Sequence, residues 1–132
     1  MKAKLIEAAR KAQKNAYAPY SNFPVGAAIR TPNGKIYAGA NVENAAYPLT
    51  RCAEQIAVGA MVTDGEREIA EVVVYTKSSP PAPPCGACRQ VLAEFAGPDT
   101  PILCVNERGE ERRYSLGELL PEAFSLSSAT RT

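Results

Sequence analysis

The chain has 132 residues, of which 45% are hydrophobic, and this length and composition suit one compact domain. Its formal net charge is +1, from 15 basic and 14 acidic residues, which argues against nucleic acid as a partner because nucleic-acid binders concentrate positive charge. The chain contains no histidine, which excludes serine–histidine and cysteine–histidine catalysis and any zinc site with an imidazole ligand.

The N-terminal part of the chain predicts a helix followed by a β-hairpin. Residues 2–18 are rich in helix-forming side chains with an apolar stripe, and prolines at positions 19 and 24 end the pattern. Residues 25–31 and 35–42 alternate as strands do and are separated by Pro-Asn-Gly, a turn-forming sequence. We therefore expect two paired antiparallel strands after the first helix.

A second helix and a buried strand follow. Residues 51–65 place Ile56, Ala60 and Met61 at helical spacing, and the pattern stops at a glycine. Residues 68–76 carry a continuous apolar run, which is typical of a strand buried on both faces.

The C-terminal third begins with a proline-rich loop, residues 77–84, and then alternates between helix and strand. The expected elements are a helix over residues 85–97, strands over 101–105 and 111–115, and a helix that begins at residue 115. Ser115 and Glu118 have the spacing of a capping box at that last helix.

The order of elements predicts an α/β fold of αβα layers, with a single five-stranded mixed sheet and helices on both faces. We expect one domain over residues 1–132, with a flexible tail from about residue 125.

The N-terminal segment lacks a continuous apolar stretch, so neither a secretory signal nor a membrane span is expected there. Four cysteines without an export signal are more typical of thiols or metal ligands than of disulfides. These observations predict a cytoplasmic protein.

Cys85 and Cys88 form a C-x-x-C pair, which can be a redox dithiol, half of a structural zinc site or part of a catalytic zinc site. A dithiol leaves Cys52 unexplained, although Cys52 begins a helix as Cys85 does. A structural zinc site needs four ligands, and the remaining candidate, Cys104, lies in the middle of a strand where a small apolar role is expected. Three protein ligands with an open fourth position describe a catalytic zinc site.

Glu54 lies two residues after Cys52, in the first turn of the second helix. A carboxylate there can lie beside a metal without binding it, and can take a proton from a zinc-bound water. The simpler alternative is that Glu54 only complements the dipole of its helix.

Cys-Ala-Glu at residues 52–54 together with Pro-Cys-Gly-Ala-Cys at residues 84–88 resembles the zinc deaminase signature in its three-cysteine form. Beyond the signature, "PYSNFPVGAA", "GANVENAAYP" and "LGELLPEAF" are similar to segments of the small homotetrameric cytidine deaminases. The resemblance extends from about Tyr17 to Phe124.

This resemblance implies hydrolysis of cytidine or deoxycytidine to the uridine product and ammonia, in pyrimidine salvage. It implies one Zn²⁺ per chain held by Cys52, Cys85 and Cys88, with Glu54 as the catalytic acid and base. It further implies that Asn41 and Glu43 bind the sugar hydroxyls. Phe23 would lie beside the base, and the Ala53 N–H would face the pyrimidine carbonyl. Tyr47 and Phe124 would reach the site of a neighbouring subunit. The full set of implied substrate-binding residues is Phe23, Asn41, Val42, Glu43, Tyr47, Ala53 and Phe124.

Two residues depart from the family pattern. Gln55 stands where an arginine is common, so we expect it to donate to a cysteine sulfur without contributing charge, which leaves the zinc more electron-rich. Arg51 could compensate for the missing charge. Pro83 stands where a serine is common, and it still supplies a backbone carbonyl.

Two other functions remain open from the sequence. A related deaminase could act on a cytosine-containing antibiotic such as blasticidin S, although the complete "FPVG" and "NVEN" segments favour a plain nucleoside. A zinc-stabilised binding module without activity is the alternative from another class.

Overall fold

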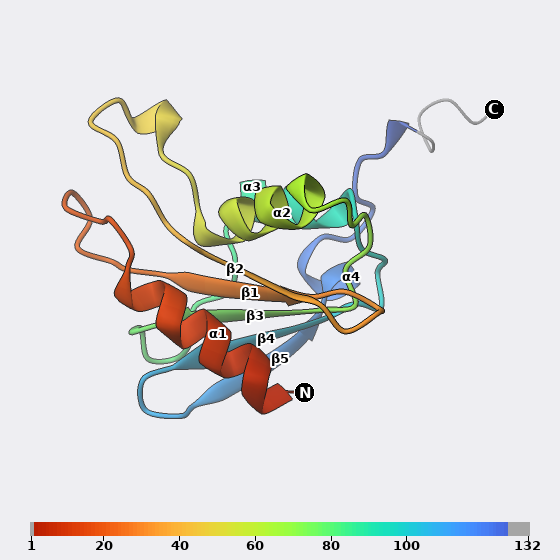
Figure 1. The fold of residues 1–132 in the computed structure, drawn as a ribbon, viewed down its shortest axis with the longest axis horizontal. Helices are drawn as coiled ribbons and strands as arrows, with labels where there is room; N and C mark the ends of the chain where they lie inside the picture. Colours follow the sequence, from red (N-terminus) through yellow and green to blue (C-terminus); the bar gives the residue numbers. More distant parts are fainter. Residues whose placement is uncertain (1, 127–132) are drawn as a thin grey trace.

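The computed structural model describes residues 2–126 and contains one five-stranded sheet flanked by helices (Figure 1). The strands are β1 (Gly26–Arg30), β2 (Ile36–Ala40), β3 (Glu71–Thr76), β4 (Pro101–Asn106) and β5 (Glu111–Ser115). The helices are α1 (Lys2–Lys14), α2 (Ala53–Thr63), α3 (Gly86–Ala93) and α4 (Leu116–Leu119), with a short 3₁₀ turn, η1, at Tyr47–Leu49. Within residues 2–126, no helix has the length and apolar character needed to cross a membrane.

The sheet has the strand order β2-β1-β3-β4-β5. β3 and β4 run parallel and are joined through α3, whereas the other neighbouring strands pair antiparallel. The predicted single mixed sheet of five strands is therefore confirmed.

Helices cover both faces of this sheet, which confirms the predicted αβα layers. On one face α1 packs Leu5 and Ala9 against a cluster that includes Val73 and Leu103. On the other face α2, α3 and α4 enclose a larger cluster, and Figure 1 shows α2 and α3 side by side above the sheet. Alternate residues of β3 and β4 point to opposite faces, so both strands are buried on both sides.

Several details differ from the sequence-based expectation. The helix expected over residues 85–97 ends at Ala93, and the strand expected over residues 68–76 begins at Glu71. The first helix ends at Lys14, four residues before the predicted end, because the chain then turns and the Tyr17 N–H donates to the carbonyl of Asn41, 3.0 Å away. In α2 only Met61 of the three residues at helical spacing is buried, whereas Ile56 and Ala60 are exposed.

The orientation of α2 depends on Gly39 in β2. A Cβ atom at this position would lie 2.6 Å from the Ala57 nitrogen and 2.7 Å from the Ala53 oxygen. The absence of a side chain lets α2 approach the sheet backbone closely, with Ala53, Ile56 and Ala57 all against Gly39. Ala53 and Ala57 are fully buried there, whereas Ile56 remains 36% exposed. This close contact also fixes the start of α2, where Cys52 and Glu54 lie.

The capping box predicted at the last helix is present, since Ser115 accepts from the Glu118 N–H and the Glu118 carboxylate accepts from the Ser115 N–H. Residues 127–132 of the predicted C-terminal tail lie outside the described part of the chain.

Candidate active site

Two helix starts meet at one edge of the sheet and bring three cysteines together. Cys52 is the N-cap residue of α2, Cys85 is the N-cap residue of α3, and Cys88 lies in the first turn of α3. Neither N-cap thiol makes a capping hydrogen bond, so both remain available as ligands. The unpaired N–H groups and the dipole at a helix start favour negative charge, as thiolate ligands require.

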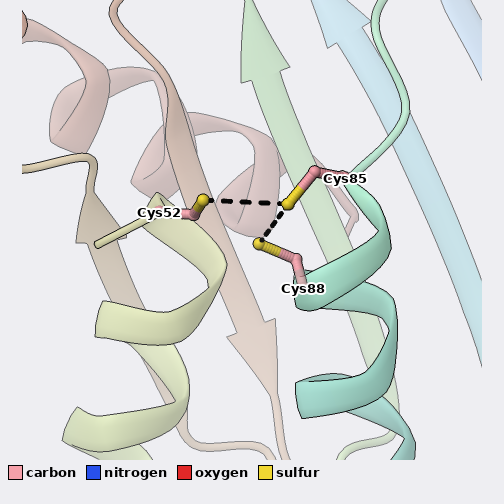
Figure 2. A group of neighbouring side chains, drawn as sticks. All are labelled: Cys52, Cys85 and Cys88. Carbon is pink, nitrogen blue, oxygen red and sulfur yellow. Dashed lines mark hydrogen bonds between the residues drawn. The ribbon is translucent and has the colours of Figure 1, made fainter. Parts of the chain in front are cut away.

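The three sulfur atoms form a compact cluster, as Figure 2 shows. Cys52 Sγ lies 3.8 Å from Cys85 Sγ, which lies 3.3 Å from Cys88 Sγ, and all three lie within 4.8 Å of one another. Three sulfurs at tetrahedral corners around zinc, at Zn–S distances of about 2.3 Å, would be about 3.8 Å apart. The donor set and its spacing therefore fit a zinc ion with three thiolate ligands.

The other possibilities for the cysteines fit less well. A redox dithiol would require Cys85 and Cys88 alone, but Cys52 belongs to the same cluster. Cys104 is fully buried in β4, and among residues 2–126 the metal-ligand cluster comprises three cysteines without it. A four-cysteine structural site is thus not formed, and an open fourth position remains.

Glu54 points into the same region from the first turn of α2. Only 3% of its surface is exposed, so it does not serve as a solvated partner for the helix dipole alone. Burial raises the pKa of Glu54 to about 7, although a hydrogen bond from its own backbone N–H acts in the opposite direction. A carboxyl group with a pKa near neutrality can both accept and donate a proton, as general acid–base catalysis requires.

The pKa values of Cys52 and Cys88 shift in opposite directions. Hydrogen bonding from the Cys88 thiol lowers the pKa of Cys52 to about 6, and the nearby Arg51 guanidinium acts in the same direction. The same hydrogen bond raises the pKa of Cys88, and burial adds to that effect. Between these two thiols Cys52 therefore has the lower pKa, at a helix start where negative charge is favoured.

Gln55 contacts the cluster from α2. Its Nε2 lies 3.9 Å from Cys88 Sγ, within the range of a weak N–H···S hydrogen bond. Arg51 uses its guanidinium to donate to the carbonyl oxygens of Pro48 and Thr50, both at 3.0 Å, so it braces the loop before α2.

A cavity of about 300 Å³ connects the sulfur cluster to the substrate-binding residues expected from the sequence. Glu54 and the three cysteines line this cavity. Four of the expected substrate-binding residues line it with them: Phe23, Asn41, Glu43 and Ala53. Residues 74 and 76 of β3 form part of its floor, which places the cavity at the carboxyl end of a parallel strand, where sites of α/β proteins gather.

Asn41 and Glu43 are both occupied by hydrogen bonds to the loop before β1. Asn41 Oδ1 accepts from the Val25 N–H and its Nδ2 donates to the Phe23 carbonyl, each at 2.9 Å. The Glu43 carboxylate accepts from the backbone N–H groups of Tyr20 and Ser21 and from the Ser21 hydroxyl. These side chains thus hold the loop that carries Phe23, and each still has unused hydrogen-bonding capacity.

The remaining expected residues lie outside the lining of this cavity. Tyr47 is 75% exposed and lines an adjoining hollow of about 320 Å³ with Tyr20, Ser21, Glu43 and Thr50. Val42 pairs its backbone with Arg51. Phe124 is 64% exposed, and its carbonyl accepts from Gln90 Nε2 at 3.0 Å.

Several lining residues were not among the predicted site residues, and two of them are shared with the adjoining hollow. Ser21 and Thr50 border both hollows. Ser21 lies inside the "PYSNFPVGAA" segment, so that segment was the available signal, whereas Thr50 lies in an exposed loop with no distinguishing pattern.

An α/β sheet with three thiols and a buried carboxylate at the start of two helices has the features of a zinc-dependent enzyme. The family model of the cytidine and deoxycytidylate deaminase zinc-binding region matches residues 1–104. The chain belongs to this family, and the predicted family, zinc cofactor and hydrolytic deaminase class are confirmed.

Individual relatives cover nearly the whole chain. A cytidine deaminase of Sporosarcina psychrophila is 46% identical over 92% of this chain and 90% of its own length. A cytidine deaminase of Halalkalibacterium halodurans is 44% identical, with 92% of each chain covered. The crystal structure of cytidine deaminase from Burkholderia pseudomallei superposes with a TM-score of 0.90 at 46% identity, covering 94% of this chain and 99% of that one.

Proposed function

We propose that this protein hydrolyses cytidine and deoxycytidine to uridine and deoxyuridine, with release of ammonia. The observation that carries the proposal is the cavity that Glu54 shares with Cys52, Cys85 and Cys88. A buried carboxyl group with a pKa near 7 lies beside a set of sulfur ligands suited to one zinc ion. That combination suits the replacement of an amine by water on an aromatic ring.

Glu54 performs the proton transfers in this proposal. Its carboxylate takes one proton from the attacking water and delivers it to N3 of the base, where it stays. It then takes the second proton from the new C4 hydroxyl and gives it to the amine, so that the C4–N bond breaks, ammonia leaves and the C4 carbonyl forms. The zinc ion held by Cys52, Cys85 and Cys88, when bound, supplies the Lewis acid that makes water a nucleophile at neutral pH. Because Glu54 is buried, bulk water does not compete for the proton.

Other cavity residues orient the nucleoside. Ala53 is the first residue of α2, so its N–H has no partner within the helix and can donate to the pyrimidine carbonyl. Phe23 packs beside the base, while Asn41 and Glu43 bind the sugar hydroxyls with the donor and acceptor capacity they retain.

A homotetramer with shared active sites is part of the proposal. Tyr47 and Phe124 are largely exposed and lie outside their own metal cavity, so each aromatic ring is available to contact a neighbouring subunit. Both side chains would then complete a neighbouring subunit's site, whereas Val42 remains a predicted contact to the substrate. Light scattering that gives the mass of one chain would contradict this assembly.

Cytoplasmic location and a role in pyrimidine salvage remain predictions.

Gln55 tunes the sulfur ligands in this proposal. The amide that lies 3.9 Å from Cys88 Sγ donates a hydrogen bond but brings no charge. The three thiolates therefore keep more of their electron density than they would beside an arginine.

The proposed function is tested by initial rates of ammonia release from cytidine, deoxycytidine, cytosine and blasticidin S. Zinc-loaded protein should deaminate the two nucleosides with similar efficiency and cytosine far more slowly, because cytosine lacks the sugar. Preferential turnover of blasticidin S would assign the antibiotic-deaminase function. If protein with one zinc per chain releases no ammonia from any of the four compounds, the remaining function would be the non-catalytic binding module.

A further inference from the structure

The Glu43 carboxylate is held by one short segment, Tyr20 to Ser21, of which Ser21 lines the metal cavity and both residues line the adjoining hollow. Its Oε1 accepts from the Tyr20 N–H at 2.8 Å and from the Ser21 N–H at 3.1 Å. Its Oε2 accepts from the Ser21 hydroxyl. The hydrogen bond from the Ser21 hydroxyl is also the largest of the effects that hold the pKa of Glu43 below its usual range.

An ionised carboxylate has about four lone-pair positions, two on each oxygen. The two backbone donors fill both positions on Oε1, and the Ser21 hydroxyl fills one on Oε2. The remaining position is therefore on Oε2. A substrate hydroxyl that donates to Glu43 must use the same oxygen that Ser21 holds.

The Ser21 hydroxyl is itself oriented by the backbone. Its oxygen accepts from the Phe23 N–H at 3.1 Å, so one lone pair is occupied and the hydroxyl proton is free to point at Glu43. Asn22, between these two residues, adopts a left-handed φ of 56°, and its N–H donates to the Ala18 carbonyl at 3.0 Å. This tight turn brings the Phe23 N–H back onto the hydroxyl.

We propose that Ser21 is a positioning residue for sugar recognition: its hydroxyl fixes Oε2 of Glu43 so that the one free acceptor position faces the cavity. Ser21 also borders both the metal cavity and the adjoining hollow. The chain Phe23 N–H, Ser21 hydroxyl, Glu43 carboxylate thus connects the residue beside the base to the residue that binds the sugar. This inference rests on the proposed function, because it assigns a role in binding the nucleoside.

A double-mutant cycle tests the inference, with kcat and KM for cytidine measured for wild type, Ser21→Ala, Glu43→Gln and the double variant. Ser21→Ala should raise KM about fivefold, the effect of losing one hydrogen bond to a charged group at a partly exposed site, and change kcat less than twofold. In the Glu43→Gln background the same substitution should change KM less than twofold, because Ser21 acts through that carboxylate.

Ser79→Ala is the matched control, since Ser79 also donates its hydroxyl to a glutamate, Glu110, at 2.7 Å but away from the cavity lining. Its KM should equal that of wild type. An unchanged KM in Ser21→Ala, or the full fivefold change in the Glu43→Gln background, would overturn the inference while the proposed function stands. Absence of cytidine turnover in the wild type would overturn the proposed function and this inference together.

Discussion

The metal end and the sugar end of the cavity are built in different ways. At the metal end, two helix starts packed against the sheet supply the cysteines and Glu54. At the sugar end, Asn41 and Glu43 reach across to a loop and hold it through hydrogen bonds to its backbone. The metal end is therefore positioned by packing, and the sugar end by individual polar contacts.

This contrast predicts two kinds of variant. Changes at the metal end should alter zinc content, stability or kcat, because the same two helix starts position the zinc ligands and Glu54. Changes at the sugar end should raise KM and leave zinc in place, because they loosen the loop beside the nucleoside without removing a zinc ligand.

Replacing a ligand should have the largest effect. Cys85→Ser exchanges a thiolate for a weakly binding hydroxyl, so we expect loss of bound zinc and a fall in kcat/KM of at least about a thousandfold. Zinc per chain is measured by elemental analysis after dialysis. Cys104→Ala, which removes a cysteine outside the cluster, should retain one zinc at a cost in stability of about 1 kcal/mol. Equal zinc loss in both variants would contradict the assigned ligand set.

The packing that places α2 should be the next most sensitive feature. Gly39→Ala puts a Cβ against the Ala57 and Ala53 backbone, so α2 must move, and we expect about 1–3 kcal/mol of lost stability together with weaker zinc binding. Thermal unfolding and chelator competition measure the two effects. Gly59→Ala on the open side of the same helix has nothing within 4 Å and should be neutral or stabilising. If both variants behave alike, close packing of α2 is not what positions the metal end.

At the sugar end, Asn41→Ala removes the contacts to the Val25 N–H and the Phe23 carbonyl. We expect KM for cytidine to rise about tenfold, the effect of losing one or two hydrogen bonds, with one zinc per chain retained. Steady-state kinetics and zinc analysis on the same preparation check this. Asn33→Ala, in the turn between β1 and β2, is the matched control and should leave KM unchanged. Loss of zinc from the Asn41 variant would remove the distinction between the two ends.

The smallest effect is expected at Gln55. Gln55→Arg adds a positive charge beside Cys88 Sγ, which the amide now contacts at 3.9 Å. Positive charge favours deprotonated groups nearby, so the acidic limb of the kcat–pH profile should move to lower pH by less than about one unit. A profile that coincides with that of wild type would show that the identity of this residue does not tune the site.

Local patterns were sufficient to predict most of the fold and the metal end. Alternation and apolar runs identified the five strands, and cysteines at two predicted helix starts indicated where the ligands meet. Both kinds of signal lie within about ten residues of sequence. The resemblance to a family then added roles for Glu54 and the sugar-binding residues.

Features that depend on distant contacts were not predictable in this way. The spacing predicted Ile56 as a core residue, but it remains 36% exposed even though its Cβ lies against Gly39 of β2. The first helix ends early because the Tyr17 N–H donates to the backbone carbonyl of Asn41, which is distant in sequence. The pairing of Ser21 with Glu43 spans 22 positions and has no local periodicity to reveal it.

The central claim is that the sulfurs hold the metal while Glu54 moves the protons, and Glu54→Gln tests it most directly. Zinc content and kcat for cytidine should be measured on one preparation, with the exposed Glu68→Gln as the control. We expect one zinc per chain and a fall in kcat of about a hundredfold to ten-thousandfold, with the control unchanged. Turnover near the wild-type rate in zinc-loaded Glu54→Gln would contradict it.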